Sequence, residues 1–314
     1  MRPFEAVEMM KRSGGKAHRF GGGWTDTKLE VIAGYLRAYT TALQDKPSKD
    51  DPFRKAYIDA FAGTGYREAR QGDGTSKKDL LFPDLAAAEP QALLDGSARI
   101  ALKNQPRFDR YLFIESSEQR CGLLEALKDE FPELADGIDV RRGDANSEIQ
   151  KICSKNWRSA RAVLFLDPYG MQVEWETIVA VAKTKAIDTW ILFPLGIGVN
   201  RLLKKSGDIP DSWRRCLDRL LGTKAWFDEF YKVRKTTTLF GVEEETVKQA
   251  STESIGRYFV ERLRSVFFAV SDKPRVLCNS SNSPLYLLCF AAGNEKGAPI
   301  AIKIANHLLT RGVD

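Results

Sequence analysis

The chain has 314 residues, of which 43% are hydrophobic, and a formal net charge of +6. This length suffices for one large hydrophobic core with an appended subdomain, which is the arrangement we expect. No apolar run approaches the ~18 residues of a membrane-spanning helix. Residues 1–23, which we interpret as a flexible basic N-terminus, lack the apolar stretch of a secretory signal. We therefore expect a cytoplasmic protein with no membrane partner.

The number and spacing of the cysteines and histidines limit which kinds of metal site, disulfide and catalytic triad the chain can form. The five cysteines are widely spaced without a C-x-x-C pair, and the sequence has two histidines, His18 and His307. This composition argues against a bound metal, a disulfide framework and a Ser-His-Asp hydrolase. Basic residues are scattered among 42 acidic ones, so the net charge only weakly favours a polyanionic partner such as nucleic acid.

The first predicted helix covers residues 24–45, where apolar positions recur at helical spacing and Thr25 or Asp26 suits the N-cap. The run "KAYIDAFAGTGYRE", residues 55–68, predicts a strand followed by a Gly-rich turn. From residue 110 onward, apolar runs alternate with helical patterns. The predicted strands lie within 110–116, 138–146, 162–170 and 188–196, and the predicted helices cover 118–131, 147–157 and 175–185. Such alternation predicts βαβ units and a doubly wound parallel sheet.

Residues 197–250 break this rhythm, and we predict an inserted helical subdomain or lid there. Within it, "SWRRCLDRLLG" has the spacing of a solvated helix face, and "FYKVRKTTTLFG" is interpreted as a basic loop. A helix over 251–267, a β-hairpin within 273–293 and a last helix over 298–311 follow. The predicted main domain therefore combines residues 24–196 and 251–314.

Acidic residues follow the apolar runs of four successive strands. Asp59 closes the first strand and Glu115 the second, while Asp144 follows the third and Asp167 closes the fourth in "LFLDPYG". Ligands of open α/β sheets bind at this carboxyl edge. The alternative for the last motif is a plain Asp-Pro-x-Gly turn in which Tyr169 caps the core.

The turn "DAFAGTG" can approach a ligand closely, because Gly63 and Gly65 lack a Cβ atom. An acid at the end of the second strand suits the hydroxyls of a ribose. The dinucleotide fingerprint is not met, because Glu68 stands where its third glycine belongs, and the P-loop pattern is absent. These features favour a nucleoside with a charged group other than phosphate, and they weaken the reading as an NAD-dependent enzyme.

This pattern resembles the class I S-adenosylmethionine-dependent methyltransferases. The segments "GWTDTKLEVIAGYLRAY", "YIDAFAGTGYRE", "GSARIAL", "LFIESS", "LFLDPYG" and "GIGVNRLL" also fall in the order of the three-Cys-motif partner (TcmP) family, over roughly residues 20–205. The resemblance implies a Rossmann-like class I methyltransferase fold, with a mostly parallel seven-stranded sheet that ends in an antiparallel hairpin. It also implies S-adenosylmethionine as the cofactor and a protein with a three-cysteine motif as a partner.

The resemblance implies roles for individual residues. The turn would hold the methionine part of the cofactor, Glu115 and Ser116 would bind the ribose, and Asp144 with the backbone of Ala145 would bind the adenine. The turn residues in this set are Asp59, Phe61, Gly63, Thr64 and Gly65. Lys28, on the first helix, either reaches the cofactor or substrate or is a solvated charge.

The motif Asp167-Pro168-Tyr169-Gly170 resembles the Asp-Pro-Pro-Tyr of amino-methyltransferases. There, the carboxylate and a proline carbonyl accept hydrogen bonds from an exocyclic amine, and the aromatic ring stacks on the base. By this resemblance, Asp167, Pro168 and Tyr169 would be catalytic in methyl transfer to a nucleic acid, plausibly at an adenine amine. This chain has one proline fewer, and its tyrosine comes one position earlier. The alternative is a non-catalytic or regulatory cofactor-binding partner of a three-Cys-motif protein.

The surface of the inserted segment, residues 197–250, is the feature that discriminates between the methyltransferase and the regulatory partner. A positive, concave face beside the pocket favours a nucleic-acid substrate, whereas a flat apolar face favours a protein partner.

Overall fold

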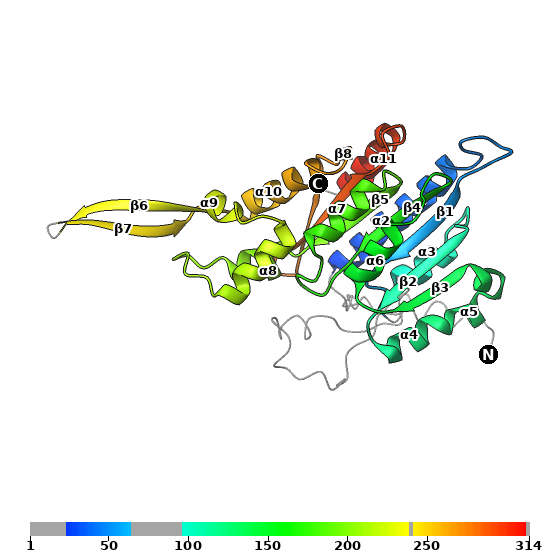
Figure 1. Cartoon of the computed structure of the whole chain (residues 1–314), viewed down its shortest axis with the longest axis horizontal. Helices are drawn as coiled ribbons and strands as arrows, with labels where there is room; N and C mark the ends of the chain where they lie inside the picture. The colour runs from blue at the N-terminus through cyan, green and yellow to red at the C-terminus, as the bar shows by residue number, and fades with distance from the viewer. Residues whose placement is uncertain (1–22, 64–95, 239–240, 312–314) are drawn as a thin grey trace, which may run out of the picture.

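The computed structural model describes residues 23–63, 96–238 and 241–311 (Figure 1). Helices and strands alternate through most of the chain. In chain order the elements are α2 (Gly23–Ala42), β1 (Arg54–Asp59), α3 (Ser97–Lys103), β2 (Arg110–Glu115), α4 (Glu118–Glu125), α5 (Leu127–Glu130), the 3-10 helix η2 (Pro132–Gly137), β3 (Ile138–Arg142), α6 (Ala145–Cys153), β4 (Ala160–Leu166), α7 (Trp175–Lys183), β5 (Ile187–Phe193), the π-helix η3 (Leu195–Asn200), α8 (Asp211–Leu221), α9 (Trp226–Phe230), β6 (Tyr231–Thr238), β7 (Gly241–Lys248), α10 (Thr252–Arg264), β8 (Ala269–Val270), β9 (Arg275–Cys278), β10 (Pro284–Ala292) and α11 (Ala298–Thr310).

The central sheet has the order β3-β2-β1-β4-β5-β10-β8, with β9 paired to β10. Strands β1 to β5 are parallel, and β10 runs antiparallel to β5, β8 and β9. The predicted Rossmann-like fold, mostly parallel and ending in an antiparallel hairpin, is therefore confirmed. The predicted number of seven strands is wrong, because the sheet has 8. The additional strand is β8, a two-residue strand too short to leave a sequence signal.

Helices cover both faces of the sheet, as Figure 1 shows. One hydrophobic cluster lies on the side of α2, α3, α4 and α11, and contains Tyr57, Phe113 and Trp190. The other lies on the side of α6, α7, α8 and α10, and contains Ile58, Leu164 and Phe259. Tyr57 and Ile58 are neighbours on β1 that belong to different clusters, because successive side chains of a strand point to opposite faces. The buried strands therefore carry continuous apolar runs, as expected for a sheet covered on both sides.

Two details of the predicted helices differ from the structure. Helix α2 begins at Gly23, so Thr25 and Asp26 lie in its first turn and neither is the N-cap. The predicted helix over 118–131 is divided at Ala126 into α4 and α5. Both differences concern helix ends, where local propensity determines the boundary only loosely. Among the described residues, we find no helix with the length and hydropathy needed to cross a bilayer.

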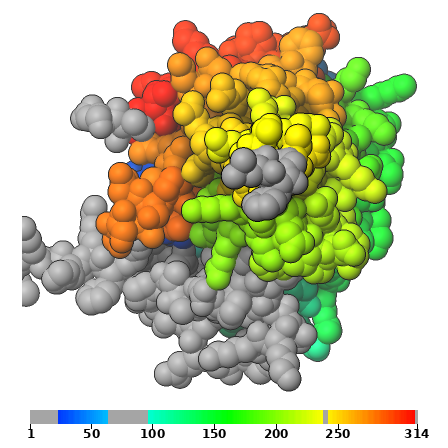
Figure 2. Space-filling model, turned by 90° about the vertical axis from the view of Figure 1, so that its left-hand side faces the viewer, coloured from blue at the N-terminus to red at the C-terminus, as the bar shows by residue number. Residues whose placement is uncertain are grey.

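Residues 197–250, the predicted helical insertion, are helical only in part. Helices η3, α8 and α9 occupy its first half. Strands β6 and β7, however, form an antiparallel ribbon in its second half, so the interpretation of "YKVRKTTT" as a loop is wrong. The ribbon projects away from the domain (Figure 1), and Figure 2 views it end-on, with the yellow-green residues of the insertion beside it. Alternating Val, Thr and charged residues suit such a two-stranded ribbon. The helical spacing of the preceding segment favours a helical prediction for the whole insertion.

Candidate active site

The sheet order brings the four strand-end acids to one edge. Asp59 and Glu115 are the last residues of β1 and β2, and Asp167 directly follows β4. Asp144 follows β3 as the N-cap of α6. Since β3, β2, β1 and β4 are neighbours in that order, these carboxylates line the carboxyl edge of four adjacent strands. Their roles toward a ligand stay predictions.

Backbone hydrogen bonds fasten the loops at this edge to neighbouring strands. The amide of Ala60 donates to the carbonyl of Phe165 at 3.2 Å, and that of Ala62 donates to Ile114 at 3.1 Å. On the other side, the amide of Gly143 donates to the carbonyl of Glu115 at 3.1 Å. The first residues of each loop therefore have fixed positions, as a preorganised binding site requires.

Asp59 is fully buried and well supplied with donors. Its carboxylate accepts hydrogen bonds from the Ser97 hydroxyl at 2.5 Å, the Tyr57 hydroxyl at 3.2 Å and the Phe61 amide at 3.3 Å. Burial raises the pKa of Asp59 from 3.8 to about 6, and the nearby charge of Asp167 adds to this effect, while the hydrogen bonds oppose it. Asp59 thus holds the start of the Gly63 turn in place, and its bound partners leave little of it for direct contact with a ligand.

Glu115 is buried, and the hydrogen bonds found for its carboxylate engage one of the two oxygens. Its Oε1 accepts from the amide of Ser117 at 2.8 Å, from a guanidinium nitrogen of Arg120 at 2.8 Å and from the hydroxyl of Ser116 at 3.2 Å. All three contacts engage the same oxygen, so Oε2 can accept a hydrogen bond from a ligand hydroxyl. Because three donors orient the carboxylate, this acceptor is fixed before any ligand arrives.

Asp144 has a structural contact of its own. Its Oδ1 accepts from the amide of Ser147 at 2.9 Å and from the Ser147 hydroxyl at 3.0 Å, which caps helix α6. The side chain is exposed and Ala145 behind it is buried. The second carboxylate oxygen can still accept from the amino group of a base, so the predicted adenine contact is compatible with the cap.

Lys28 is not the solvated charge that one reading of the sequence allowed. It is buried, with a relative exposure of 6%, and its Nζ lies 2.6 Å from Oδ2 of Asp167. The same ammonium lies 5.2 Å from the ring centroid of Trp24 and 6.0 Å from that of Phe165. Helix α2 therefore supplies a cation to the strand-end site, a contact between residues 139 positions apart in sequence.

Tyr169 is displayed at the surface, with a relative exposure of 57%. This excludes the alternative in which its ring caps the core. Its amide donates to Oε1 of Gln172 at 3.1 Å, while Pro168 before it and Gly170 after it are buried. Gly170 has φ +82°, a left-handed conformation that favours glycine. The tight turn thus places a largely exposed aromatic residue two positions after Asp167.

The Gly63 turn lies next to this ring. Gly63 has φ +62°, and a Cβ atom at this position would meet the Tyr169 hydroxyl at 3.9 Å as its nearest neighbour. With respect to the described residues, the turn thus leaves space for a ligand, with the tyrosine at its border. Phe61 packs against the core below. Thr64 and Gly65, also predicted to bind the cofactor, lie outside the described residues.

These residues fit the nucleoside of S-adenosylmethionine. The open cradle at Gly63, the oriented Oε2 of Glu115 and the free oxygen of Asp144 offer close backbone approach, a ribose acceptor and a base acceptor in that order along β1, β2 and β3. A carboxylate-rich edge also suits a cationic sulfonium better than it suits phosphates.

Sequence reasoning missed the residues that orient the acids. Ser97 holds Asp59, and Arg120 holds Glu115. Asn146 accepts from the Glu174 amide at 3.0 Å and donates to the Gln172 carbonyl at 2.9 Å, so it fixes the loop that follows Asp167. Asn146 belongs to the "GDAN" stretch and Ser97 to "GSARIAL", but their partners are distant in sequence, and no spacing rule connects them.

Comparison with protein-family models and with curated proteins gives no match. Among solved structures, the chain is similar to a Legionella pneumophila protein over 93% of both chains, with 14% identity and a TM-score of 0.47. It is also similar to spermidine synthase in complex with the transition-state analogue AdoDATO, with 12% identity, 93% of this chain and 65% of that chain covered, and a TM-score of 0.41. The O-methyltransferase TomG of Streptomyces achromogenes in complex with SAM gives 12% identity over 80% of this chain and 100% of that chain, with a TM-score of 0.33.

Methyltransferases therefore occur among the structural neighbours of this chain at low sequence identity. Because these TM-scores are below 0.5, the fold is assigned from the strand order of the chain itself. Membership of the three-Cys-motif partner family stays a prediction.

Proposed function

We propose that this protein is an S-adenosylmethionine-dependent methyltransferase that acts on a nucleic acid, at an exocyclic amine such as that of adenine. The observation that carries the proposal is the pairing of Asp167 with an exposed Tyr169 at the end of β4, beside the open turn at Gly63. The fold supports this proposal, because the strand order brings Glu115, Asp144 and Asp167 to one edge of the sheet.

The cofactor would supply a methyl group already activated on its sulfonium. Glu115 would hold its ribose and Asp144 its adenine, through the carboxylate oxygens that their structural contacts leave available. The protein then has to bind and orient the acceptor, since positioning is the larger part of what such a transfer needs.

Asp167 would perform this orientation. Its Oδ2 is engaged by Lys28 at 2.6 Å, so Oδ1 would accept a hydrogen bond from the acceptor amine and hold its N–H in one direction. The ring of Tyr169 would stack on the base, a contact worth about 1–3 kcal/mol. A base inside a duplex would first have to leave the stack, so an unpaired base is the better substrate.

The first experiment is titration calorimetry with S-adenosylmethionine, with S-adenosylhomocysteine and NAD as comparators, followed by labelled methyl transfer to RNA and DNA. Binding of the first two without NAD is expected. Asp167→Ala should abolish transfer and leave cofactor affinity within a few-fold, whereas Asp208→Ala, a change of an exposed aspartate in the insertion, should leave both unchanged. Equal loss of transfer and cofactor affinity in Asp167→Ala would contradict the proposed role.

The second candidate is a regulatory cofactor-binding partner of a three-Cys-motif protein. The contact between Lys28 and Asp167 favours it, because this pair already occupies one oxygen of the carboxylate that would orient an acceptor. Cofactor binding without transfer to any nucleic acid, together with a complex with such a protein, would support this candidate over the first.

A further inference from the structure

The insertion carries half of the net positive charge of the chain. Residues 197–250 contain eleven lysines and arginines against eight aspartates and glutamates, an excess of three positive charges, whereas the whole chain has a net charge of +6. A segment with this excess attracts polyanions, in contrast to the carboxylate-rich strand ends.

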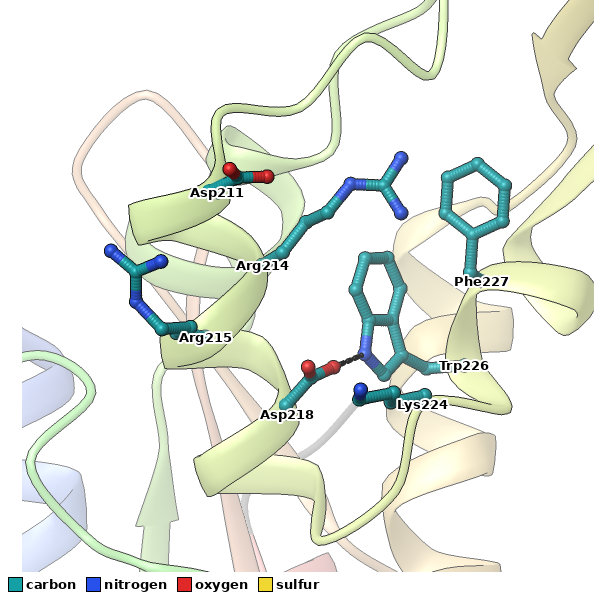
Figure 3. Close-up of a pocket in the computed structure, with 7 residues that line it drawn as sticks. All are labelled: Asp211, Arg214, Arg215, Asp218, Lys224, Trp226 and Phe227. Carbon is teal, nitrogen blue, oxygen red and sulfur yellow. Dashed lines mark hydrogen bonds between the residues drawn. The ribbon is translucent and has the colours of Figure 1, made fainter.

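Helix α8 and the loop after it surround a surface cavity of about 270 Å³ (Figure 3). Two of its side chains are used in packing. Arg214 lies 4.3 Å from the ring centroid of Phe227 and donates to the carbonyls of Gly207 and Ile209. Asp218 accepts from the indole nitrogen of Trp226 at 2.7 Å, the contact drawn in Figure 3.

The other charged groups at the cavity are exposed. Arg215 and Lys224 are solvent-accessible, as is Asp211 in the first turn of α8. An acidic residue in this turn interacts favourably with the positive end of the helix. Arg215 and Lys224 are therefore the cations that this cavity offers to a ligand.

The insertion lies against the loop that carries the proposed acceptor residues. Arg219 of α8 is 3.7 Å from Glu174, which ends that loop. Gly222, at the end of α8, has no room for a Cβ atom against the Trp175 ring. A Cβ atom at Gly198 in η3 would likewise lie 3.2 Å from Met171. Helix α8 therefore packs against the end of the loop that begins at Asp167 and Tyr169.

The projecting ribbon does not provide this charge. Lys235 forms an ion pair with Glu244 at 2.6 Å, and Arg234 lies directly opposite Glu245. The positive charges of β6 are thus balanced by the glutamates of β7. The ribbon also exposes an apolar side chain, Val233, at 58%. A ribbon of this composition suits a protein partner better than it suits phosphates. The exposed cations at the α8 cavity, Arg215 and Lys224, are the candidates for phosphate contacts.

We propose that the Arg215–Lys224 surface of the α8 cavity binds the phosphodiester backbone of the nucleic acid whose unpaired base enters the strand-end site. This inference rests on the proposed function. Phosphate contacts fix the register of a strand without reading its sequence, and base contacts select the target. The charges agree with these two roles. The strand-end carboxylates would contact the base and the cofactor, and Arg215 and Lys224 would contact the phosphates.

The test is a double charge reversal, Arg215→Glu with Lys224→Glu. The matched control reverses Lys183 and Lys296, two exposed lysines away from the insertion. Fluorescence anisotropy with a labelled single-stranded RNA and DNA of the same sequence, over a series of salt concentrations, measures binding. The affinity of the insertion variant for the strand is expected to fall at least about tenfold. The slope of log K against log salt concentration should become shallower by about 1.4, the value for two lost phosphate contacts on a single strand. Its affinity for S-adenosylhomocysteine should match that of the control.

The outcomes separate this surface from the proposed function. The insertion variant and the control could show equal strand affinity and slope while methyl transfer to the strand is intact. This result would overturn the proposed phosphate-binding surface and leave the proposed function standing. Strand binding that depends on Arg215 and Lys224, with no transfer to any strand, would keep the surface and overturn the function. A wild-type protein that binds neither strand at low salt would also overturn the surface.

Discussion

Replacing Asp59 by asparagine should change how stability responds to pH. Asp59 has a relative exposure of 0%, and burial raises its pKa from 3.8 to about 6. At neutral pH, the folded protein therefore holds a carboxylate in a site that stabilises the charged form less well than water does. The unfolded chain has no such penalty, because its carboxyl groups are in water.

The magnitude follows from this difference in pKa. A shift from 3.8 to about 6 corresponds to about 3 kcal/mol of stability at about 1.4 kcal/mol per pKa unit. Between these pH values the folded state binds more protons than the unfolded state, so the free energy of unfolding falls as pH rises. The penalty is absent below the unfolded pKa and complete above the folded one. About 2 kcal/mol of it should appear between about pH 4.5 and about pH 7.5.

Urea unfolding at these two pH values measures the effect. The quantity of interest is the difference in unfolding free energy between Asp59→Asn and the wild type, because any pH-independent loss, such as a weaker contact with Ser97, cancels between the two conditions. This difference should move by about 2 kcal/mol in favour of the variant as the pH rises. Asp208→Asn, a change at an exposed site, should show no movement.

The same difference at both pH values would refute the reasoning, since it would mean that Asp59 ionises without cost in the folded protein. Asp188→Asn offers an independent repetition on β5. Burial raises the pKa of Asp188 to about 6 as well, and the Tyr35 hydroxyl donates to it at 2.8 Å. A response at one site and none at the other would restrict the argument to the responding residue.

Three further substitutions test the site and the core. Glu115→Ala should weaken S-adenosylmethionine binding by about 1.5–3 kcal/mol, the worth of a hydrogen bond to a charged group; calorimetry measures this, and unchanged affinity would refute the ribose assignment. Gly222→Ala should destabilise the fold by about 2–5 kcal/mol in urea unfolding, because φ is +66° and the new Cβ would lie 2.0 Å from the Trp175 ring; Gly122→Ala, with open space at its Cβ, is the control. Phe259→Ala should cost about 3–5 kcal/mol, since its buried ring stacks on Phe193 at 4.0 Å; a loss below about 1 kcal/mol in thermal unfolding would contradict this packing.

The sequence alone determined the βαβ part of the fold. Continuous apolar runs bounded by turn residues and separated by amphipathic patterns are local features, and they predicted β1 to β5 and the β9–β10 hairpin. The acids at the strand ends were predictable for the same reason. Once the strands are parallel, the carboxyl ends of neighbours share an edge, so the grouping of Asp59, Glu115 and Asp167 needed no knowledge of side-chain contacts.

The insertion and the charge partners were decided only by tertiary structure. The strands β6 and β7 pair mainly with each other, and their alternation of Thr, Val and charge is as compatible with an exposed loop as with a ribbon. The burial of Lys28 depends on where helix α2 packs, because its partner Asp167 lies 139 residues away. Local patterns specify which faces are apolar, whereas the choice of contacts between distant segments depends on how those faces pack together. The ion pair of Lys28 with Asp167 and the contacts of helix α8 with Glu174 and Trp175 are consequences of that packing.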